Sequence, residues 1–398
     1  MIPYGRQNIT DEDIAAVVEC LRSDFLTQGP KIQAFEEAFA KCVGAKHAVA
    51  VNNATAALHL AMLVGGIGPG HRVVTSPITF LASANCAAFV GATPDFSDVD
   101  PATLNLCPDT LEKFWKPDTK AVIAVDYAGL PAEMPKISRI AKEKGALVIE
   151  DACHGVGGGF EHQGRTWKLG SHPWADMTTF SFHPVKTMTT GEGGMLVTNN
   201  DEYAKKARLL RSHGVEREKF SGLGCEEEEF KEKGPWYYEM QALGFNYRLT
   251  DIQSALGLSQ LKRLPAMIAR RQEIVAKYNQ ELSGISWLQT PGSENLKNRD
   301  LISWHLYTVL IDFKKIGKSR TEVMLELRGK GVGTQVLYIP VHLQPWYQKT
   351  FAYRPGKCPV AEGVYPRLIS LPLYPDLSDA DVNHVIESVK AIPKKMLP

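Results

Sequence analysis

One lysine, Lys186, has neighbours that suit chemistry better than contact with solvent. It lies in the stretch FSFHPVKTMTTGEGG (180–194), between a strand-like run and a turn rich in threonine and glycine. The apolar residues Phe182, Pro184 and Val185 come just before it. Burial disfavours the charged ammonium, so a lysine in such surroundings can be a neutral nucleophile that forms a Schiff base with a carbonyl cofactor. The alternative is an ordinary loop lysine between two strands.

A lysine of this kind serves pyridoxal phosphate when three further groups are present: an acid against the pyridine nitrogen, a ring-stacking group and a phosphate cradle. Asp151 is the candidate acid. It ends the run ALVIED (146–151), and a carboxylate at the end of a buried parallel strand points into the ligand crevice. A strand-end aspartate can instead cap the next turn. Phe80, after the junction SPITF, could lie flat on the cofactor ring or could be a core aromatic.

The phosphate cradle has a candidate in NNATAAL (52–58), where a strand passes into a helix. The hydroxyl of Thr55 and the free N–H groups of Ala54 and Ala56 could bind phosphate at the helix N-terminus. The alternative is that Thr55 or Asn53 only caps the helix.

Alternating strand and helix patterns fill the first two-thirds of the chain and place these residues at one edge of a sheet. Apolar runs predict strands at 47–52, 72–77, 93–99, 121–126, 146–151, 177–182 and 194–199. Helical patterns lie at 54–66, 80–91 and 134–145. This rhythm predicts a largely parallel sheet with helices on both faces, which binds ligands beyond the carboxyl ends of its strands.

A long helical pattern, from about Thr250 to Leu282, predicts a bridge to a second, smaller α+β domain. The elements expected there are strands at 304–312 and 334–340 and helices at 320–331 and 378–392. We therefore predict a large domain with an N-terminal arm over residues 1–255 and a small domain over residues 256–398. Residues 214–243 are charged and irregular, as in a solvated surface excursion or a substrate lid.

The composition excludes several classes of protein. The chain has 398 residues, of which 44% are hydrophobic and 22% charged, as in soluble globular proteins. A net charge of +1 provides no basic field for nucleic acid or an anionic membrane, and no apolar stretch is long enough for a membrane span. The seven cysteines form no C-x-x-C pair, so neither a disulfide framework nor a metal site is indicated. Without an apolar leader, we expect a cytoplasmic protein.

Six motifs follow one another along nearly the whole chain: NNATAAL, SPITFLASAN, VDYAGLPAEM, VIEDACHGVG, FSFHPVKTMTTGEGG and GFNYRLTDIQSALGLSQL. In this ordered set the chain resembles the DegT/DnrJ/EryC1/StrS family of sugar aminotransferases, which are fold-type I pyridoxal phosphate enzymes. The resemblance implies that Lys186 forms the Schiff base and that Asp151 holds the ring nitrogen. It also implies that His154, otherwise a core histidine, hydrogen-bonds the ring hydroxyl.

The resemblance assigns further contacts. It implies a phosphate cradle and a stacking ring formed by Ser181, Ala54, Thr55, Ala56 and Phe80. Asn246, in GFNYR, matches an asparagine that reaches the phosphate from the neighbouring subunit, which implies a homodimer with composite sites. Arg248 could bind a carboxylate or phosphate of the substrate, or be an exposed arginine at a helix start.

Within the family, the stretches PYGRQNI, LTQG, SFHPVK, TTGEGG and RSHG resemble the transaminase subgroup of pseudaminic acid biosynthesis. That subgroup implies transfer of an amino group from glutamate to C4 of a UDP-linked 4-keto-6-deoxy-N-acetylhexosamine, in the synthesis of a cell-surface polysaccharide. Family relatives bind the nucleotide sugar through positions that match Tyr4, Asp24, Phe25, Leu26, Thr27 and a strand of Leu337, Tyr338, Ile339 and Pro340. The excursion 214–243 is longer than that subgroup leads us to expect.

Other activities occur on the same scaffold. The substrate could be a different 4-keto sugar, of the GDP-perosamine or the dTDP-linked type. Some relatives are 3-dehydratases, but these carry histidine where this chain has Lys186. Cysteine desulfurases need a reactive cysteine, and Cys153, at a strand end, is expected to be packed. A regulatory protein that only binds the cofactor would favour a degenerate site, whereas every cofactor position is intact here.

Overall fold

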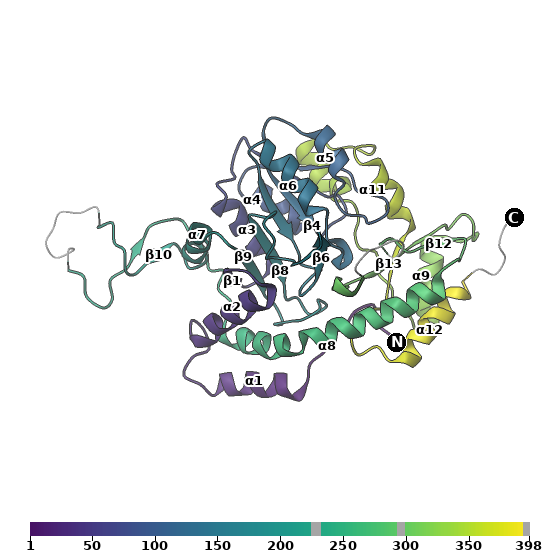
Figure 1. Ribbon diagram of the computed structural model, residues 1–398, viewed down its shortest axis with the longest axis horizontal. Helices are drawn as coiled ribbons and strands as arrows, with labels where there is room; N and C mark the ends of the chain where they lie inside the picture. Colours follow the sequence, from purple (N-terminus) through teal and green to yellow (C-terminus); the bar gives the residue numbers. More distant parts are fainter. Residues whose placement is uncertain (224–231, 293–298, 393–398) are drawn as a thin grey trace.

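The computed structural model describes residues 1–223, 232–292 and 299–392, and its centre is a seven-stranded sheet in the order β1-β9-β8-β5-β4-β2-β3 (Figure 1). The strands are β1 (His47–Val51), β2 (Arg72–Thr75), β3 (Thr93–Phe96), β4 (Thr119–Val125), β5 (Leu147–Asp151), β8 (Met177–Ser181) and β9 (Gly194–Thr198). In this sheet β9 runs antiparallel to β1 and β8, and the other neighbours are parallel. The predicted mostly parallel sheet is confirmed.

Helices cover both faces of this sheet because successive strand side chains point to opposite sides. Val49, Val51 and Ile123 pack on one face with α3 (Ala54–Val64), α4 (Ala82–Phe89) and α7 (Asp201–Arg211). Their strand neighbours Ala50 and Val122 face the other side. That side is covered by α2 (Pro30–Val43), α5 (Pro108–Phe114), α6 (Met134–Glu143) and part of α8 (Asp251–Leu282).

The helix α8 runs along the molecule and contacts both α2 and the C-terminal helix α12 (Asp379–Lys390) (Figure 1). It begins where Thr250 and Gln253 form a capping box, which is the expected start of this helix. A separate apolar core joins Ile274 and Tyr278 of α8 to the second sheet. The predicted division at residue 255 falls within α8, and it stays a prediction.

The second sheet has the order β12-β13-β14 and is antiparallel. Its strands are β12 (Leu288–Gln289), β13 (Tyr307–Ile311) and β14 (Leu368–Leu371), and α9 (Arg320–Gly329) follows β13 in the chain. The strand predicted at 334–340 is wrong. Only Gln335 bridges to Ser370, and Pro340 has no N–H to continue a ladder.

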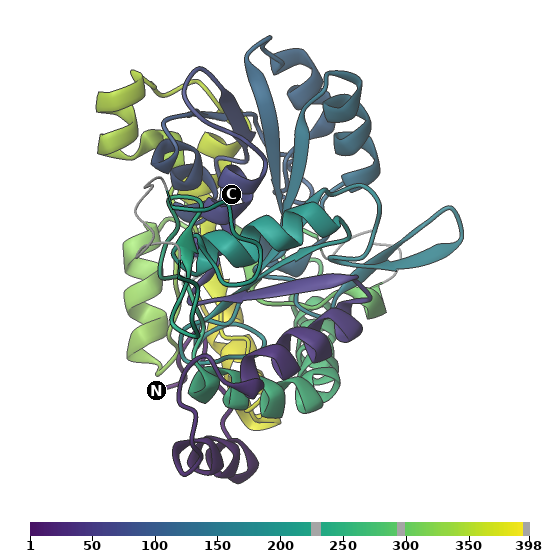
Figure 2. The same ribbon diagram turned by 90° about the vertical axis from the view of Figure 1, so that its left-hand side faces the viewer.

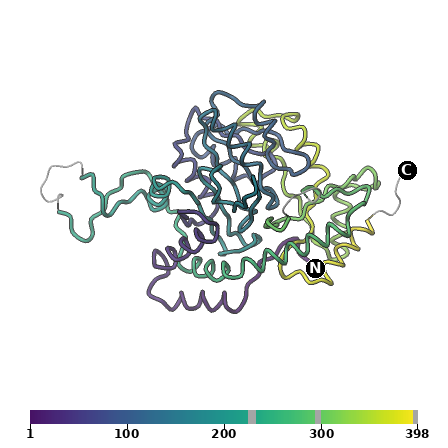
Figure 3. Tube along the Cα trace, in the orientation of Figure 1, coloured from purple at the N-terminus to yellow at the C-terminus, as the bar shows by residue number. Residues whose placement is uncertain are grey.

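Several elements lie outside the predicted set. Among the described helices and strands, they are α1 (Asp11–Leu21), α2, α5, α7, α10 (Pro345–Phe351), α11 (Pro359–Val364), β12, the hairpin of β6 (Gly159–His162) and β7 (Arg165–Lys168), and the pair β10 (Val215–Glu216) and β11 (Glu239–Met240). The helix α1 packs on α8, below the sheet (Figures 1 and 2). The trace leaves the body of the molecule after α7, where β10 and β11 pair (Figure 3). The excursion 214–243 lies partly outside the described residues.

No helix in the described ranges is long and apolar enough to cross a membrane.

Candidate active site

A cavity of about 510 Å³ lies beyond the carboxyl ends of β4, β5 and β8. This volume is typical of sites that bind small molecules. Seven residues predicted to hold the cofactor line it together: Lys186, Asp151, His154, Ser181, Ala54, Thr55 and Phe80. The parallel strands bring these residues together because their carboxyl ends meet at one edge of the sheet. Ala56 and Asn246 do not line the cavity.

The carboxylate of Asp151 is buried at the end of β5, with 5% of the residue exposed. Its Oδ2 accepts a hydrogen bond of 2.6 Å from the Ser83 hydroxyl, which lies 2.8 Å from the hydroxyl of Thr79. Within the described ranges, Asp151 forms no salt bridge. A buried carboxylate without a cationic partner suits a protonated ring nitrogen, so Asp151 fits the cofactor.

The Lys186 side chain faces the same cavity from the turn after β8. Burial lowers the pKa of Lys186 below the ordinary value of 10.5, although Cys153 and Asp151 act in the opposite direction. A lowered pKa leaves more of the amine neutral, as a nucleophile and base requires. Its Nζ lies 3.5 Å from Nε2 of His305.

The start of α3 forms the proposed phosphate cradle. Asn53 is the N-cap, and its Oδ1 accepts a hydrogen bond of 2.8 Å from the N–H of Ala56. The Ala56 N–H is therefore not free, which corrects the prediction for this residue. The N–H groups of Ala54 and Thr55, at the first two helical positions, have no intrahelical acceptor, and both residues line the cavity. A Cβ on Gly194 would lie 2.6 Å from the Ala54 nitrogen. The strand β9 can therefore approach the start of α3 only because residue 194 has no side chain.

The ring of His154 has a defined tautomer. Its Nδ1 accepts a hydrogen bond of 3.2 Å from the Ala128 N–H, so the proton of the neutral ring lies on Nε2. Burial, and secondarily Lys186, holds the pKa of His154 well below its usual range. The Nε2–H points to the Tyr338 hydroxyl at 3.2 Å. A donor at this place can serve the ring hydroxyl of the cofactor, as predicted for His154.

Phe80 is 58% exposed, and it lines the cavity rather than the core. The alternative of a core aromatic is therefore wrong for this residue. Its ring centroid lies 6.1 Å from that of Tyr338, a second aromatic wall of the cavity. Cys153 also lines the cavity, but burial raises its pKa well above the ordinary value, so its sulfur is a thiol rather than a reactive thiolate.

The predicted substrate residues fall into two groups. Tyr4, Leu337 and Tyr338 line the cavity. The remaining ones do not line it, and these are Asp24, Phe25, Leu26, Thr27, Ile339, Pro340 and Arg248. The four residues 24–27 are exposed on the loop between α1 and α2, and Asn246 is exposed as well.

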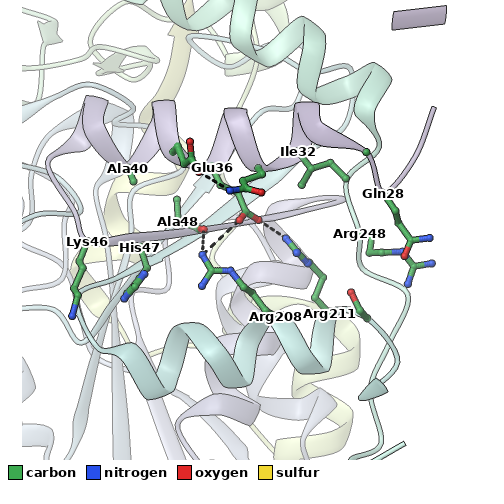
Figure 4. Close-up of a pocket in the computed structure, with 14 residues that line it drawn as sticks. Gln28, Ile32, Glu36, Ala40, Lys46, His47, Ala48, Arg208, Arg211 and Arg248 are labelled. Carbon is green, nitrogen blue, oxygen red and sulfur yellow. Dashed lines mark hydrogen bonds and ion pairs between the residues drawn. The ribbon is translucent and has the colours of Figure 1, made fainter. Parts of the chain in front are cut away.

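Arg248 lines a second cavity, of about 530 Å³, between α2, β1 and α7 (Figure 4). In this cavity Glu36 binds Arg208 and Arg211, whereas Arg248 lies apart, beside Gln28 (Figure 4). Its guanidinium Nε is buried and has no hydrogen-bond partner within the described ranges.

Sequence reasoning missed Ser83, Thr79 and His305. His305 lies in the apolar run WHLY, which was interpreted only as the start of a strand. The one sequence signal for His305 is that it is a histidine among apolar residues. No group of three or more His, Cys, Asp or Glu side chains that could hold a metal ion occurs in residues 1–223, 232–292 and 299–392.

Comparison with known proteins agrees with this geometry. The model of the DegT/DnrJ/EryC1/StrS aminotransferase family matches residues 7–390. The chain belongs to this family. It is therefore an aminotransferase with pyridoxal phosphate as its cofactor, and the predicted resemblance is confirmed.

Three relatives of the DegT/DnrJ/EryC1/StrS family show the range of the similarity. The spore coat polysaccharide biosynthesis protein SpsC of Bacillus subtilis (strain 168) is 43% identical over 394 residues, which cover 99% of this chain and 97% of SpsC. PseC of Helicobacter pylori, an aminotransferase involved in the biosynthesis of pseudoaminic acid, has a TM-score of 0.87 with 33% identity over 99% of both chains. Spr1654 of Streptococcus pneumoniae, in a PLP-form, has a TM-score of 0.87 with 29% identity over 100% of both chains.

Proposed function

We propose that this enzyme transfers an amino group from glutamate to C4 of a UDP-linked 4-keto-6-deoxy-N-acetylhexosamine, leaving 2-oxoglutarate. The observation that carries the proposal is one cavity that is lined by Lys186, Asp151 and His154 together with Tyr4 and Tyr338. The similarity to PseC over 99% of both chains supports the choice of sugar. The similarity to SpsC supports a role in polysaccharide synthesis.

The cofactor residues have separate tasks in this reaction. When bound between these residues, pyridoxal phosphate would supply an electrophilic carbonyl and a protonated ring that can store an electron pair. Lys186 Nζ would hold the cofactor at rest and, as a free amine, would take the proton from the α-carbon of the amino donor. Asp151 keeps a proton on the ring nitrogen, and the Ser83 hydroxyl fixes the orientation of its carboxylate. The neutral His154 donates from Nε2 to the ring hydroxyl.

The open side of the cavity must orient the sugar. The reacting carbon has to stand about 3–3.5 Å from the amine that attacks it. Tyr4 and Tyr338 line the cavity, and burial raises the pKa of both hydroxyls, so both stay protonated donors near neutral pH. Hydroxyl donors suit a sugar that carries an N-acetyl carbonyl, because an analogue without this acceptor leaves a buried donor unpaired.

Substrate preference tests the proposed sugar. We expect turnover on the UDP-linked 4-keto sugar to exceed turnover on GDP- and dTDP-linked 4-keto sugars by about tenfold or more in kcat/KM, since lost polar partners in the site raise the barrier. The measurement is mass spectrometry of the aminated products with glutamate as donor. A preference for a GDP or dTDP sugar would overturn the subgroup assignment and leave the aminotransferase assignment intact.

We also infer a homodimer with composite active sites. Asn246 and residues 24–27 are exposed and lie outside the cavity of their own chain. Phe25 and Leu26 are 51% and 45% exposed, and solvent exposure of neighbouring large apolar side chains favours a protein contact. A twofold dimer would let one chain supply these residues to the cavity of the other.

Complementation tests this dimer. Lys186→Ala removes the reactive amine, and Asn246→Asp sets a carboxylate against the cofactor phosphate, so each parent should be nearly inactive. In a mixed dimer with composite sites, one site carries both substitutions and the other carries none. After subunit exchange of equal amounts, we expect about a quarter of wild-type activity, because half of the dimers are mixed and each has one intact site.

The control is native mass spectrometry of the same mixture, in which a dimer of intermediate mass shows that exchange has occurred. Activity that stays at the level of the parents after verified exchange would place Asn246 at the site of its own chain.

A further inference from the structure

Two histidines of the cavity are held by the same turn of the backbone. Residues Tyr127–Gly129 follow β4, and Ala128 has a φ of 61°, which is rare for a residue with a side chain. In this conformation the Ala128 N–H donates to Nδ1 of His154 at 3.2 Å. The Ala128 carbonyl accepts a hydrogen bond of 2.9 Å from the N–H of His305. The turn therefore fixes His154 and His305 relative to each other.

Gly129 lets the second of these histidines come close. Its φ is 97°, and a Cβ at this position would lie 2.0 Å from the carbonyl oxygen of Ser303. Residues 303–305 can thus pass over the turn only because residue 129 has no side chain. The ring centroids of His154 and His305 consequently lie 4.6 Å apart.

His305 lines the cavity with 4% of its surface exposed, and its Nε2 lies 3.5 Å from Nζ of Lys186. Its Nδ1 has no hydrogen-bond partner within the described part of the chain. No other hydrogen bond of the Lys186 amine is found among the described residues. Among the described residues, the Lys186 amine therefore has its hydrogen-bond contact with the His305 ring, and the His305 ring with the Lys186 amine.

The groups that face His305 keep it uncharged. Burial comes first, and electrostatic interactions with Lys186, His154, Arg271 and His183 add to it, so the pKa of His305 lies well below its usual range. Arg271 is itself buried, and its Nη1 donates to the carbonyl oxygens of Leu373 at 2.8 Å and His305 at 3.4 Å. An imidazole in this position can form hydrogen bonds but is a poor acceptor of a whole proton.

A neutral partner is what a catalytic lysine requires. When Lys186 is released from the cofactor, its flexible side chain of four methylene groups has to keep the amine at the cavity. A carboxylate partner would fix the amine but would favour its charged form. An uncharged imidazole fixes it without adding a negative charge beside Cys153 and Asp151, which already oppose the lowering of the pKa of Lys186 by burial.

We propose that His305 is the positioning residue for the free Lys186 amine, which it holds through Nε2 while the cofactor is bound to donor or product. This inference rests on Lys186 as the cofactor lysine. It assigns His305 no proton transfer of its own. It also explains why the turn 127–129 tolerates a strained alanine and requires a glycine, since this turn holds His305 in place.

Three substitutions separate this hydrogen bond from packing. A glutamine side chain can place a polar atom where Nε2 lies, an asparagine reaches only as far as Nδ1, and a phenylalanine keeps the ring without nitrogen. We expect His305→Phe and His305→Asn to lower kcat by about tenfold to a hundredfold, because the amine is misplaced, with KM for the sugar nearly unchanged. His305→Gln should retain most of the activity. Thermal unfolding of each variant reports on the fold.

A matched pair provides a readout that does not depend on activity. His305→Glu has the shape of His305→Gln but carries a charge that favours the ammonium form of Lys186. The full-length chain is freed of cofactor, and the rate at which added pyridoxal phosphate becomes linked to it is followed by absorbance from pH 6 to 10. We expect the pH midpoint of this rate to be higher in His305→Glu than in His305→Gln by about one unit or more.

The outcomes are distinct. Equal midpoints in the Glu and Gln variants, or equal kcat in the Phe and Gln variants, would overturn the role of His305. Failure of the wild-type chain to link the cofactor at Lys186, measured by borohydride reduction and peptide mass spectrometry, would instead contradict the proposed catalytic lysine.

Discussion

Replacement of Lys186 by alanine is expected to abolish transamination. The variant loses both the amine that holds the cofactor at rest and the base that moves the proton. General base catalysis alone contributes about 10² to 10⁴-fold, so turnover should fall by at least about 10³-fold. Steady-state turnover with glutamate and the 4-keto sugar measures this loss. Lys186→Arg should be equally inactive, because a guanidinium stays protonated at any pH that the protein tolerates.

A second measurement locates the linkage itself. Borohydride reduction should attach the cofactor covalently to Lys186 of the wild type and leave Lys186→Ala unmodified. The matched control is Lys120→Ala, since Lys120 is exposed on β4 and lies outside the cavity. Its activity should equal that of the wild type. If Lys186→Ala retained turnover near the wild-type level, the catalytic lysine would have to be sought elsewhere.

The pH dependence of the linkage follows from the environment of the amine. Imine formation requires the neutral amine, so its rate in the cofactor-free chain rises as the pH rises through the pKa of Lys186. Burial lowers that pKa from 10.5, and the midpoint should therefore lie below 10.5. This direction agrees with the expectation from sequence, in which the apolar neighbours of Lys186 imply a desolvated amine.

The residues that could be predicted from sequence are those that end strands. Asp151 and Ser181 close the apolar runs of β5 and β8, and Ala54 opens the helix after β1. Parallel strands bring such ends to one edge, so a correct strand pattern is enough to gather them. The pattern also predicted α8, because the capping box at Thr250 marks its start.

The residues that could not be predicted depend on contacts between distant parts of the chain. His305 lies 119 positions from Lys186, and the two meet only because the turn at Ala128 binds the backbone of residue 305. Phe80 could be a core or a cavity residue by its sequence, and its 58% exposure decides between them. By its sequence, the N–H of Ala56 could donate either to the cofactor phosphate or to a capping side chain. In the structure it donates to the side chain of Asn53.

Substitution of Asp151 by asparagine should leave the cofactor linked to Lys186 but slow transamination strongly. Asparagine has nearly the same shape, and its amide oxygen can still accept the hydrogen bond from Ser83. It carries no charge to hold a proton on the ring nitrogen, so the ring stores the electron pair less well. Loss of one preorganised electrostatic partner costs on the order of 10² to 10³-fold in kcat.

The Asp151→Asn variant thus separates binding from chemistry. Its linkage to the cofactor, by absorbance and borohydride reduction, should resemble that of the wild type, whereas Lys186→Ala should lack the linkage altogether. Ser83→Ala is a milder variant for comparison, because it keeps the carboxylate of Asp151 but removes the 2.6 Å hydrogen bond that orients it. A hydrogen bond to a charged group contributes about 1.5–3 kcal/mol, so Ser83→Ala should reduce kcat by roughly ten- to a hundredfold. Turnover of Asp151→Asn within a few-fold of the wild type would show that another group protonates the ring nitrogen. In that case the buried carboxylate at the end of β5 would serve only to hold Ser83 and the turn at Cys153.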